Sequence, residues 1–291
     1  MPVALNPAPP NAAAVKLWGG VNWQKVLVVA ILVLGAACML LPYYWMFITS
    51  IKPPAEIHTY PPRFYVLQPT LEPYRDLFRL LPMARALCNS LLVASMVTVS
   101  NLLFCSLAGY AFAKLRFPGR DAIFLIMLGS LMIPWQVNLI PGFILIKWLG
   151  WLDTFWALII PKLALPFGIF LCRQYILSIP DTLLEAARID GCTEFGIYRR
   201  IILPLIIPAL ATLAIFTFLA QWNDFVWPLV VMQSSEMRTV PLIIGVLNGQ
   251  FGSNFAMMMA GAVVVTLPMI TIFLIFQRQF IRGVFLTGLR E

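Results

Sequence analysis

The residues of this sequence that could do chemistry are gathered in one stretch, 173–204, which reads RQYILSIPDTLLEAARIDGCTEFGIYRRIILP. The carboxylates of Glu185 and Asp190 supply hydrogen-bond acceptors near the two ends of a short predicted helix. Between them, Ala186 and Ala187 are small enough for the backbone of another protein to approach closely. This is the chemistry of recognition, so we interpret the stretch as a docking element.

Local signals within the stretch predict a helix, a glycine break and a second helix. Residues 181–190 are good helix formers, and Gly191 is typical of a left-handed helix end. Thr193 can cap the second helix. The apolar faces are expected to hold Leu183 and Ala187 in the first helix, and Phe195, Tyr198 and Ile202 in the second. An amphipathic hairpin lying on lipid headgroups fits the same pattern, and the residues alone leave both interpretations open.

The rest of the sequence offers no grouping of residues for catalysis or metal binding. His58 is the only histidine, and the five cysteines stand singly, at Cys38, Cys88, Cys105, Cys172 and Cys192. Scattered cysteines in apolar surroundings are typical of small buried hydrophobes. The sequence also lacks the phosphate-binding pattern G-x-x-x-x-G-K-[ST]. We therefore expect no catalytic residue, no metal and no bound cofactor.

The composition identifies the surroundings in which the stretch must be positioned. Of 291 residues, 61% are hydrophobic and 11% are charged, against roughly 25% charged in an ordinary soluble domain. The mean hydropathy is +0.88. Such a chain cannot cover a water-exposed surface, which disfavours a soluble enzyme or a nucleic-acid binder. The net charge of +8 is therefore read by its position along the chain.

Apolar runs long enough to cross a membrane, about 20 residues each, predict an all-α integral membrane protein. Six spans are expected, at 26–48, 86–113, 122–147, 154–172, 205–227 and 257–277. Several contain proline, as at Pro134, Pro161 and Pro208, and such breaks are tolerated where neighbouring helices satisfy the freed backbone groups. We expect a bundle of helices, 25–291, after a disordered tail rich in Ala and Pro, 1–24.

Basic residues predict the orientation. With the N-terminus inside, most Lys and Arg fall on the cytoplasmic side, including Arg188, Arg199 and Arg200 of the 173–204 stretch. Both termini are therefore expected in the cytoplasm. The first outer loop weakens the bias, and its segment 71–81 is predicted to form a short interfacial helix.

Polar residues inside the predicted spans are candidates for a translocation path. Ser95, Thr98 and Asn101 recur every three positions, and Gln136 and Asn138 follow a proline. Hydroxyls and amides of this kind also serve as contacts between helices, and that alternative stays open. Lys162 lies in mid-span, where a charge faces a cavity or a partner. Asp224 is its partner only if the helices bring the two together.

Several motifs resemble the maltose-type carbohydrate permeases of binding-protein-dependent ABC importers. The EAA loop of that family is matched in spacing by Glu185, Ala186, Ala187, Asp190, Gly191, Ile201, Leu203 and Pro204. GYAFAKLRFPGR at 109–120, WNDFVWPLVV at 222–231 and QRQFIRGV at 277–284 are similar to other parts of these permeases. The resemblance implies the type I ABC importer permease fold in a prokaryotic cytoplasmic (inner) membrane.

The resemblance also implies partners. These are a second homologous permease, two ATPase subunits that carry the ATP and Mg, an extracytoplasmic solute-binding protein, membrane lipid, and no nucleic acid. It assigns contact with the ATPase to Glu185, Ala186, Ala187, Asp190, Gly191, Leu203 and Pro204. It assigns contact with the solute-binding protein to Asn248, Gly249 and Gln250, in an outer segment whose composition also fits an ordinary flexible turn.

The function implied is inward transport of a carbohydrate, meaning a sugar, oligosaccharide, polyol or sugar phosphate. An ABC permease for a non-sugar solute is the nearest alternative. An ion-coupled secondary carrier would usually show carboxylates within its spans and inverted repeats, which are not evident here. An intramembrane enzyme would need a nucleophile, base or metal group that the sequence does not provide.

Overall fold

The computed structural model describes residues 23–252 and 254–288, and within these ranges the chain is helical with no strand. The prediction of an all-α protein is confirmed. The expected tail, 1–24, lies outside the described residues except for its last two, which belong to the first helix. The elements are α1 Trp23–Ser50, α2 Pro54–Ile57, α3 Glu72–Leu80, α4 Met83–Lys114, α5 Arg120–Ser130, η1 Trp135–Asn138, α6 Leu139–Trp148, α7 Phe155–Ile159, η2 Ile160–Lys162, α8 Pro166–Leu177, α9 Asp181–Ile189, α10 Glu194–Ile197, η3 Tyr198–Ile202, α11 Leu203–Leu205, α12 Ile207–Trp222, α13 Val226–Val231, α14 Val240–Phe251 and α15 Phe255–Gly288.

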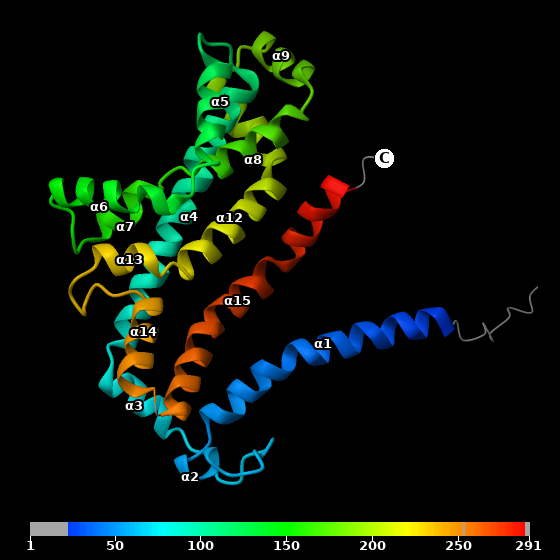
Figure 1. The fold of residues 1–291 in the computed structure, drawn as a ribbon. Helices are drawn as coiled ribbons and strands as arrows, with labels where there is room; N and C mark the ends of the chain where they lie inside the picture. Colours follow the sequence, from blue (N-terminus) through cyan, green and yellow to red (C-terminus); the bar gives the residue numbers. More distant parts are fainter. Residues whose placement is uncertain (1–22, 253, 289–291) are drawn as a thin grey trace, which may run out of the picture. The chain divides into compact units, whose positions relative to one another are not determined.

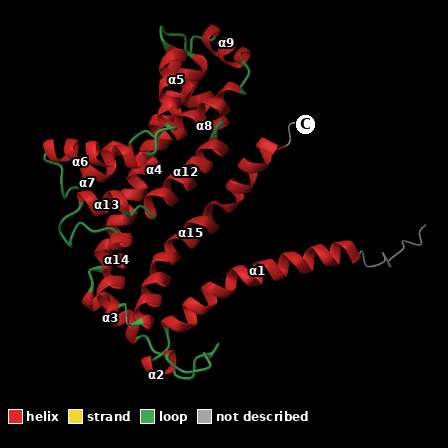
Figure 2. Cartoon of the chain, viewed as in Figure 1, coloured by secondary structure: helices red, strands yellow, loops and turns green. Residues whose placement is uncertain are grey.

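The chain divides into two compact units, Met1–Trp45 and Met46–Glu291. The described part of the first unit is the greater part of α1, a helix long and apolar enough to cross a membrane. The second unit is a set of helices joined by loops, the segment between α2 and α3 being a long one (Figure 2). It contains the stretch 173–204 and every other candidate residue named above.

Four helical segments are long and apolar enough to cross a membrane, and six spans result when each of two bent helix pairs counts as one. One bent pair is α5 with η1 and α6, where the bend is 94°. Pro134 stands at this break, because proline lacks the donor that a continuing helix needs. The second pair, bent by 76°, joins Glu194–Leu205 to α12, whose first turn contains Pro208. The prolines therefore redirect these spans, as expected.

Helix α4 is the central element of the second unit. It packs against α8 and α12, and α12 packs in turn against α15 (Figure 1). The approach of α4 to α8 depends on two glycines. A Cβ added to Gly109 would lie 2.7 Å from the Cβ of Cys172, and one added to Gly168 would lie 2.7 Å from the Sγ of Cys105. Any larger residue would force the two helices apart.

The ends of α4 lie near different sets of helices, with α5, α8 and α9 at one end and α3 and α14 at the other (Figure 1). Helix α3 confirms the short helix expected within 71–81. Arg79 and Asp76, one turn apart on this helix, form an ion pair of 3.0 Å. A separate buried cluster joins α3, the start of α4, α14 and α15, with Leu77, Met83, Val240 and Leu247 among its members.

The segment 248–254, whose composition fits a flexible turn, is helical in its first part, and residue 253 lies outside the described residues. Asn248, Gly249 and Gln250 form the last turn of α14. The preceding residues explain why, since Val240, Ile243 and Leu247 are buried. Their spacing places them on one helical face, and burial of that face outweighs the turn preference of glycine and asparagine.

Candidate functional site

The 173–204 segment has the predicted form of a helix, a break and a second helix. Helix α9 ends at Ile189 with Asp190 as its C-cap, and Gly191 follows with a left-handed φ of +78°. The Gly191 amide donates to the carbonyl of Arg188 at 3.0 Å, and the Cys192 amide donates to that of Ala187 at 2.9 Å. These two bonds satisfy carbonyls that the helix end would otherwise leave free, in a turn that favours glycine.

The second helix begins where the sequence predicted. The Gly196 amide donates to the Thr193 Oγ1 at 3.2 Å, which makes Thr193 the N-cap of α10. Helix α10 continues through the wider π turn η3, Tyr198–Ile202, into α11, which contains Leu203 and Pro204. Leu203 is half-buried and Pro204 is exposed.

One face of α9 is buried in the protein's own core. Leu184 and Ala187 belong to a cluster with residues of α4, α8 and α12, and Ala187 is only 7% exposed. The prediction that Leu183 would accompany Ala187 is wrong, because Leu183 is exposed and Leu184 is buried in its place. In the second helix Tyr198 and Ile202 are buried as expected, whereas Phe195 is exposed.

The opposite face of α9 is free of contacts with that core. Glu185, Ala186, Asp190 and Gly191 are exposed. Ile189, which the sequence reasoning did not single out, is 86% exposed in this structure. An isoleucine set between the polar positions Arg188 and Asp190 was the sequence signal for this residue. The outward face is therefore acidic and small, with the large apolar side chain of Ile189 at its end and the exposed Leu183 near its start.

An ion pair ties the two helices of the segment together. Arg188 on α9 donates through its Nε to the Glu194 Oε1 of α10 at 2.7 Å. This hydrogen bond raises the pKa of Arg188. At the start of α9, the Lys114 ammonium of α4 donates to Asp181 and lowers the pKa of that carboxyl. These shifts keep the Asp181 carboxylate and the Arg188 guanidinium charged near neutral pH.

Lys162 is paired with Asp224, the partner that the sequence left open. Its ammonium forms an ion pair with Asp224 and donates to the Gln221 Oε1 at 2.9 Å. The side chains of Lys162 and Asp224 are 20% and 18% exposed in this structure. Lys162 lies in η2, at the interruption between α7 and α8 in the span Phe155–Leu177. A charge in mid-span is thus compensated by Asp224, which lies just after the end of α12.

Asn101 of α4 satisfies the interrupted backbone of the same span. Its Nδ2 donates to the carbonyl of Lys162 at 2.7 Å, and its Oδ1 accepts from the Leu165 amide at 2.9 Å. Breaks of this kind need such partners inside a membrane. For Asn101, the structure therefore supports the alternative of contact between helices.

The other candidates for a path are placed separately. The Thr98 hydroxyl donates to the Ala94 carbonyl of its own helix at 2.7 Å. Ser95 and Thr98 line a largely apolar hollow of about 520 Å³ between α4, α12 and α15. Gln136 and Asn138 lie exposed on η1. The structure thus joins Asn101 to Lys162 and leaves the two amides on a separate turn.

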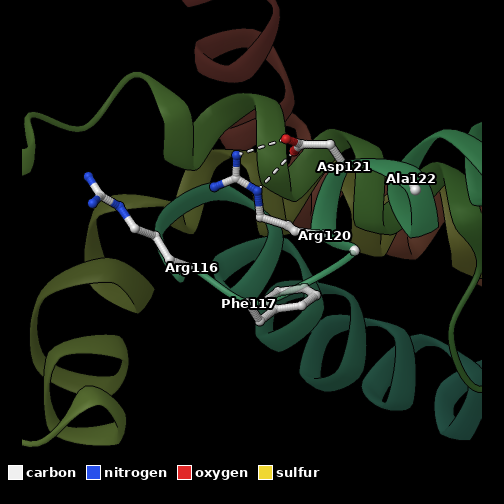
Figure 3. Close-up of a pocket in the computed structure, with 6 residues that line it drawn as sticks. Arg116, Phe117, Arg120, Asp121 and Ala122 are labelled. Carbon is white, nitrogen blue, oxygen red and sulfur yellow. Dashed lines mark hydrogen bonds and ion pairs between the residues drawn. The ribbon is translucent and has the colours of Figure 1, made fainter.

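The remaining features show no reactive site in the described part of the chain. No group of three or more His, Cys, Asp and Glu there is placed to hold a metal ion. An open hollow of about 410 Å³ lies where α4 ends and α5 begins (Figure 3). There the Arg120 guanidinium faces the Asp121 carboxylate, with Nε and Oδ1 2.9 Å apart. Asn248, Gly249 and Gln250 are exposed at the end of α14.

Comparisons with known proteins agree with this geometry. Residues 105–286 match the family described as binding-protein-dependent transport system inner membrane component. The arabinooligosaccharides transport system permease protein AraQ of Halalkalibacterium halodurans is 42% identical over 69% of this chain and 72% of its own. The lactose transport system permease protein LacG of Rhizobium radiobacter is 30% identical over 87% of this chain and 92% of its own.

A solved structure shares the fold. It is a bacterial ABC transporter involved in the import of the acidic polysaccharide alginate, with a TM-score of 0.76, 24% identity, and coverage of 89% of this chain and 96% of that one. The match to the binding-protein-dependent transport family excludes the ion-coupled carrier considered above. Because the family model matches more than half of the chain and AraQ is 42% identical over 69% of it, the chain belongs to the binding-protein-dependent transport system inner membrane components, as a multi-pass permease of an ABC importer and not itself an ATPase.

Proposed function

We propose that this subunit works with a second homologous permease, two ATPase subunits and an extracytoplasmic solute-binding protein to import a carbohydrate. The observation that supports this most directly is the two-sided character of α9. Leu184 and Ala187 on its inner side are packed into the core. Glu185, Ala186 and Ile189 on the other side are exposed and do not belong to that core. An anchored helix with a free face fits docking to another protein.

The outward face of α9 is the proposed contact with the ATPase. Ala186 lets the partner approach closely, the Glu185 carboxylate offers an acceptor, and Asp190 with Gly191 ends the helix sharply. Leu203 and Pro204 continue the contact toward the membrane. ATP and Mg bind on the partner, since this chain has no phosphate-binding loop. Movement of the ATPase pair would then move α9 and, through it, the membrane helices.

The exposed end of α14 is the proposed contact with the solute-binding protein. Asn248, Gly249 and Gln250 offer amide and backbone groups there. Because they belong to a helix buried at Ile243 and Leu247, they are presented on a firm base. A firm base lowers the ordering cost of binding.

The proposed path passes the polar group centred on Lys162. Its ion pair with Asp224 is partly exposed, so solute hydroxyls can reach both side chains. Asn101 positions this group through the backbone of residues 162 and 165. Ser95, Thr98, Gln136 and Asn138 add uncharged polar groups, which suit a solute with many hydroxyls. The carbohydrate class is further supported by the similarity to AraQ and LacG, which are permeases for arabinooligosaccharides and for lactose.

Affinity purification of this chain from its own membranes in mild detergent tests the assembly. We expect an ATPase subunit and a second permease to co-purify, with ATP hydrolysis that rises when the solute-binding protein is added. Reconstituted vesicles are then offered arabinotriose, lactose and, as a non-carbohydrate control, L-methionine. Accumulation of a sugar supports the proposal. Accumulation of methionine alone contradicts the carbohydrate class, and purification without any ATPase contradicts the assembly.

A further inference from the structure

Three polar side chains on α4 each hold a different part of the 173–204 segment. Ser106, Tyr110 and Lys114 are spaced four residues apart, so they lie along one side of the helix. The Ser106 Oγ and the Tyr198 hydroxyl of η3 are 2.7 Å apart. The Tyr110 hydroxyl donates to the Glu194 Oε2 at 2.5 Å.

The third side chain, Lys114, holds the beginning of α9. Its Nζ donates at 2.6 Å to the Ile179 carbonyl and at 2.6 Å to the Asp181 Oδ1. The side chain of Lys114 is 5% exposed in this structure, although that of Asp181 is 72% exposed. A lysine is seldom buried without a specific partner, so this contact is a fixed one.

The part of α4 that carries Ser106, Tyr110 and Lys114 is itself held by buried contacts. Ser106 and Tyr110 are buried, and each has a hydrogen-bond partner. On the same helix, Gly109 brings the backbone of α4 close to that of α8 at Arg173. The Arg173 Nε donates to the Phe112 carbonyl at 3.2 Å, and its guanidinium lies 4.1 Å from the ring centre of Phe124 on α5. Such contacts in a water-poor interior are costly to break.

From this geometry we infer that Ser106, Tyr110 and Lys114 are positioning residues that fix the 173–204 segment on α4, so that force applied to α9 is passed along α4. The inference rests on the proposed function, because it assigns the path by which the ATPase acts on the membrane helices. The same helix carries Asn101, which holds the interrupted span at Lys162. One continuous helix therefore links the docking segment to the proposed solute path.

A positioning role differs from a merely structural one in a measurable ratio. If the three residues only stabilised the fold, their loss would lower the amount of assembled transporter, and uptake and ATP hydrolysis would fall together. If they transmit movement, ATP hydrolysis continues while less solute enters for each ATP. The solute accumulated per ATP hydrolysed separates the two cases, because it does not depend on the amount of protein.

Two pairs of matched variants in the reconstituted complex test the inference. Tyr110→Phe removes the hydroxyl that holds Glu194, and Tyr175→Phe is its control, because the buried Tyr175 hydroxyl has no hydrogen-bond partner among the described residues. Lys114→Met removes the ammonium, and Lys114→Arg keeps a positive donor. We expect sugar accumulated per ATP to fall roughly fivefold or more in Y110F and K114M. We expect Y175F to match the wild type and K114R to recover part of the loss.

The results separate this inference from the proposed function. The wild-type complex is measured first, with arabinotriose or lactose as the solute, and failure to co-purify an ATPase would refute the proposed function whatever the variants do. If the wild type couples normally, an unchanged ratio in Y110F and K114M overturns the inference alone. A parallel fall of uptake and hydrolysis with a constant ratio also overturns it, because the residues would then be structural.

Discussion

The Lys162 ammonium forms an ion pair with the Asp224 carboxylate across 62 residues of sequence, at the interruption of the span Phe155–Leu177. Removing one charge leaves the other poorly compensated, at a cost of about 3 kcal/mol. Lys162→Met or Asp224→Leu alone should lower the melting temperature in detergent. The double variant should recover most of the loss, because it leaves no unpaired charge. A double variant as unstable as the sum of the two would contradict a direct interaction.

Asn101 should be needed for stability more than its neighbour Thr98. Asn101→Leu keeps the volume but leaves the Lys162 carbonyl and the Leu165 amide without their partner, at about 1–3 kcal/mol for each group. Thr98→Val loses only a bond within its own helix and serves as the control. Thermal unfolding in detergent and proteolysis near residues 160–165 measure the difference. Equal melting temperatures for the two variants would contradict a stabilising role of the bonds from Asn101 to residues 162 and 165.

Gly191 should tolerate alanine poorly and proline not at all. Alanine meets open space there, yet the left-handed φ of +78° costs it about 1 kcal/mol. Proline cannot adopt this φ and would also lose the bond to the Arg188 carbonyl. Gly191→Pro should therefore abolish uptake while the solute-binding protein still binds its ligand and the subunit. Gly129→Ala, in an open site of α5, is the control, and normal uptake by Gly191→Pro would refute the role of this turn.

Replacing either of the neighbouring alanines of α9 by arginine should impair the transporter, but for different reasons. Ala186 is exposed, so Ala186→Arg should leave the folded subunit intact and prevent the ATPase from binding. Ala187 is buried against the core, so Ala187→Arg should destabilise the subunit itself. Yield of the folded subunit and recovery of the ATPase after purification distinguish the outcomes. An ATPase that binds A186R normally would rule out this face as the docking surface.

The end of α14 should affect the response to the solute-binding protein. Asn248→Arg combined with Gln250→Arg changes only exposed side chains. We expect ATP hydrolysis stimulated by the solute-binding protein to fall several-fold, while unstimulated hydrolysis is kept. Gly129→Ala, in an open site of α5 away from this contact, is the control. Unchanged stimulation of the double arginine variant would remove this contact from the proposal.

Local signals predicted the parts of the fold that depend on nearby residues. The end of α9 at Gly191 and the cap at Thr193 each follow from side chains within a few positions, and both are present. The prolines predicted the breaks but not their angles. A change of direction by 94° depends on what α5 and α6 pack against, which no short window of sequence contains.

Contacts between distant residues could not be predicted from the sequence. Nothing near Lys114 indicates Asp181, and nothing near Tyr110 indicates Glu194. On α9, residues 183 and 184 fit an apolar face with Ala187 about equally well, and the surrounding helices select Leu184. At 248–250, local composition favoured a turn, and burial of Leu247 extended the helix instead.

The opposed faces of α9 also bear on exchange of partners. Residues that anchor the helix inward, Leu184 and Ala187, are separate from those that face outward, such as Glu185, Ala186 and Ile189. The outward set can therefore be replaced without disturbing the inward set. A chimera that carries the outward α9 residues of another permease and keeps Leu184 and Ala187 should bind the ATPase of that other permease. If the proposed docking holds, α9 keeps the residues that select the ATPase separate from the residues that fix the helix within the permease.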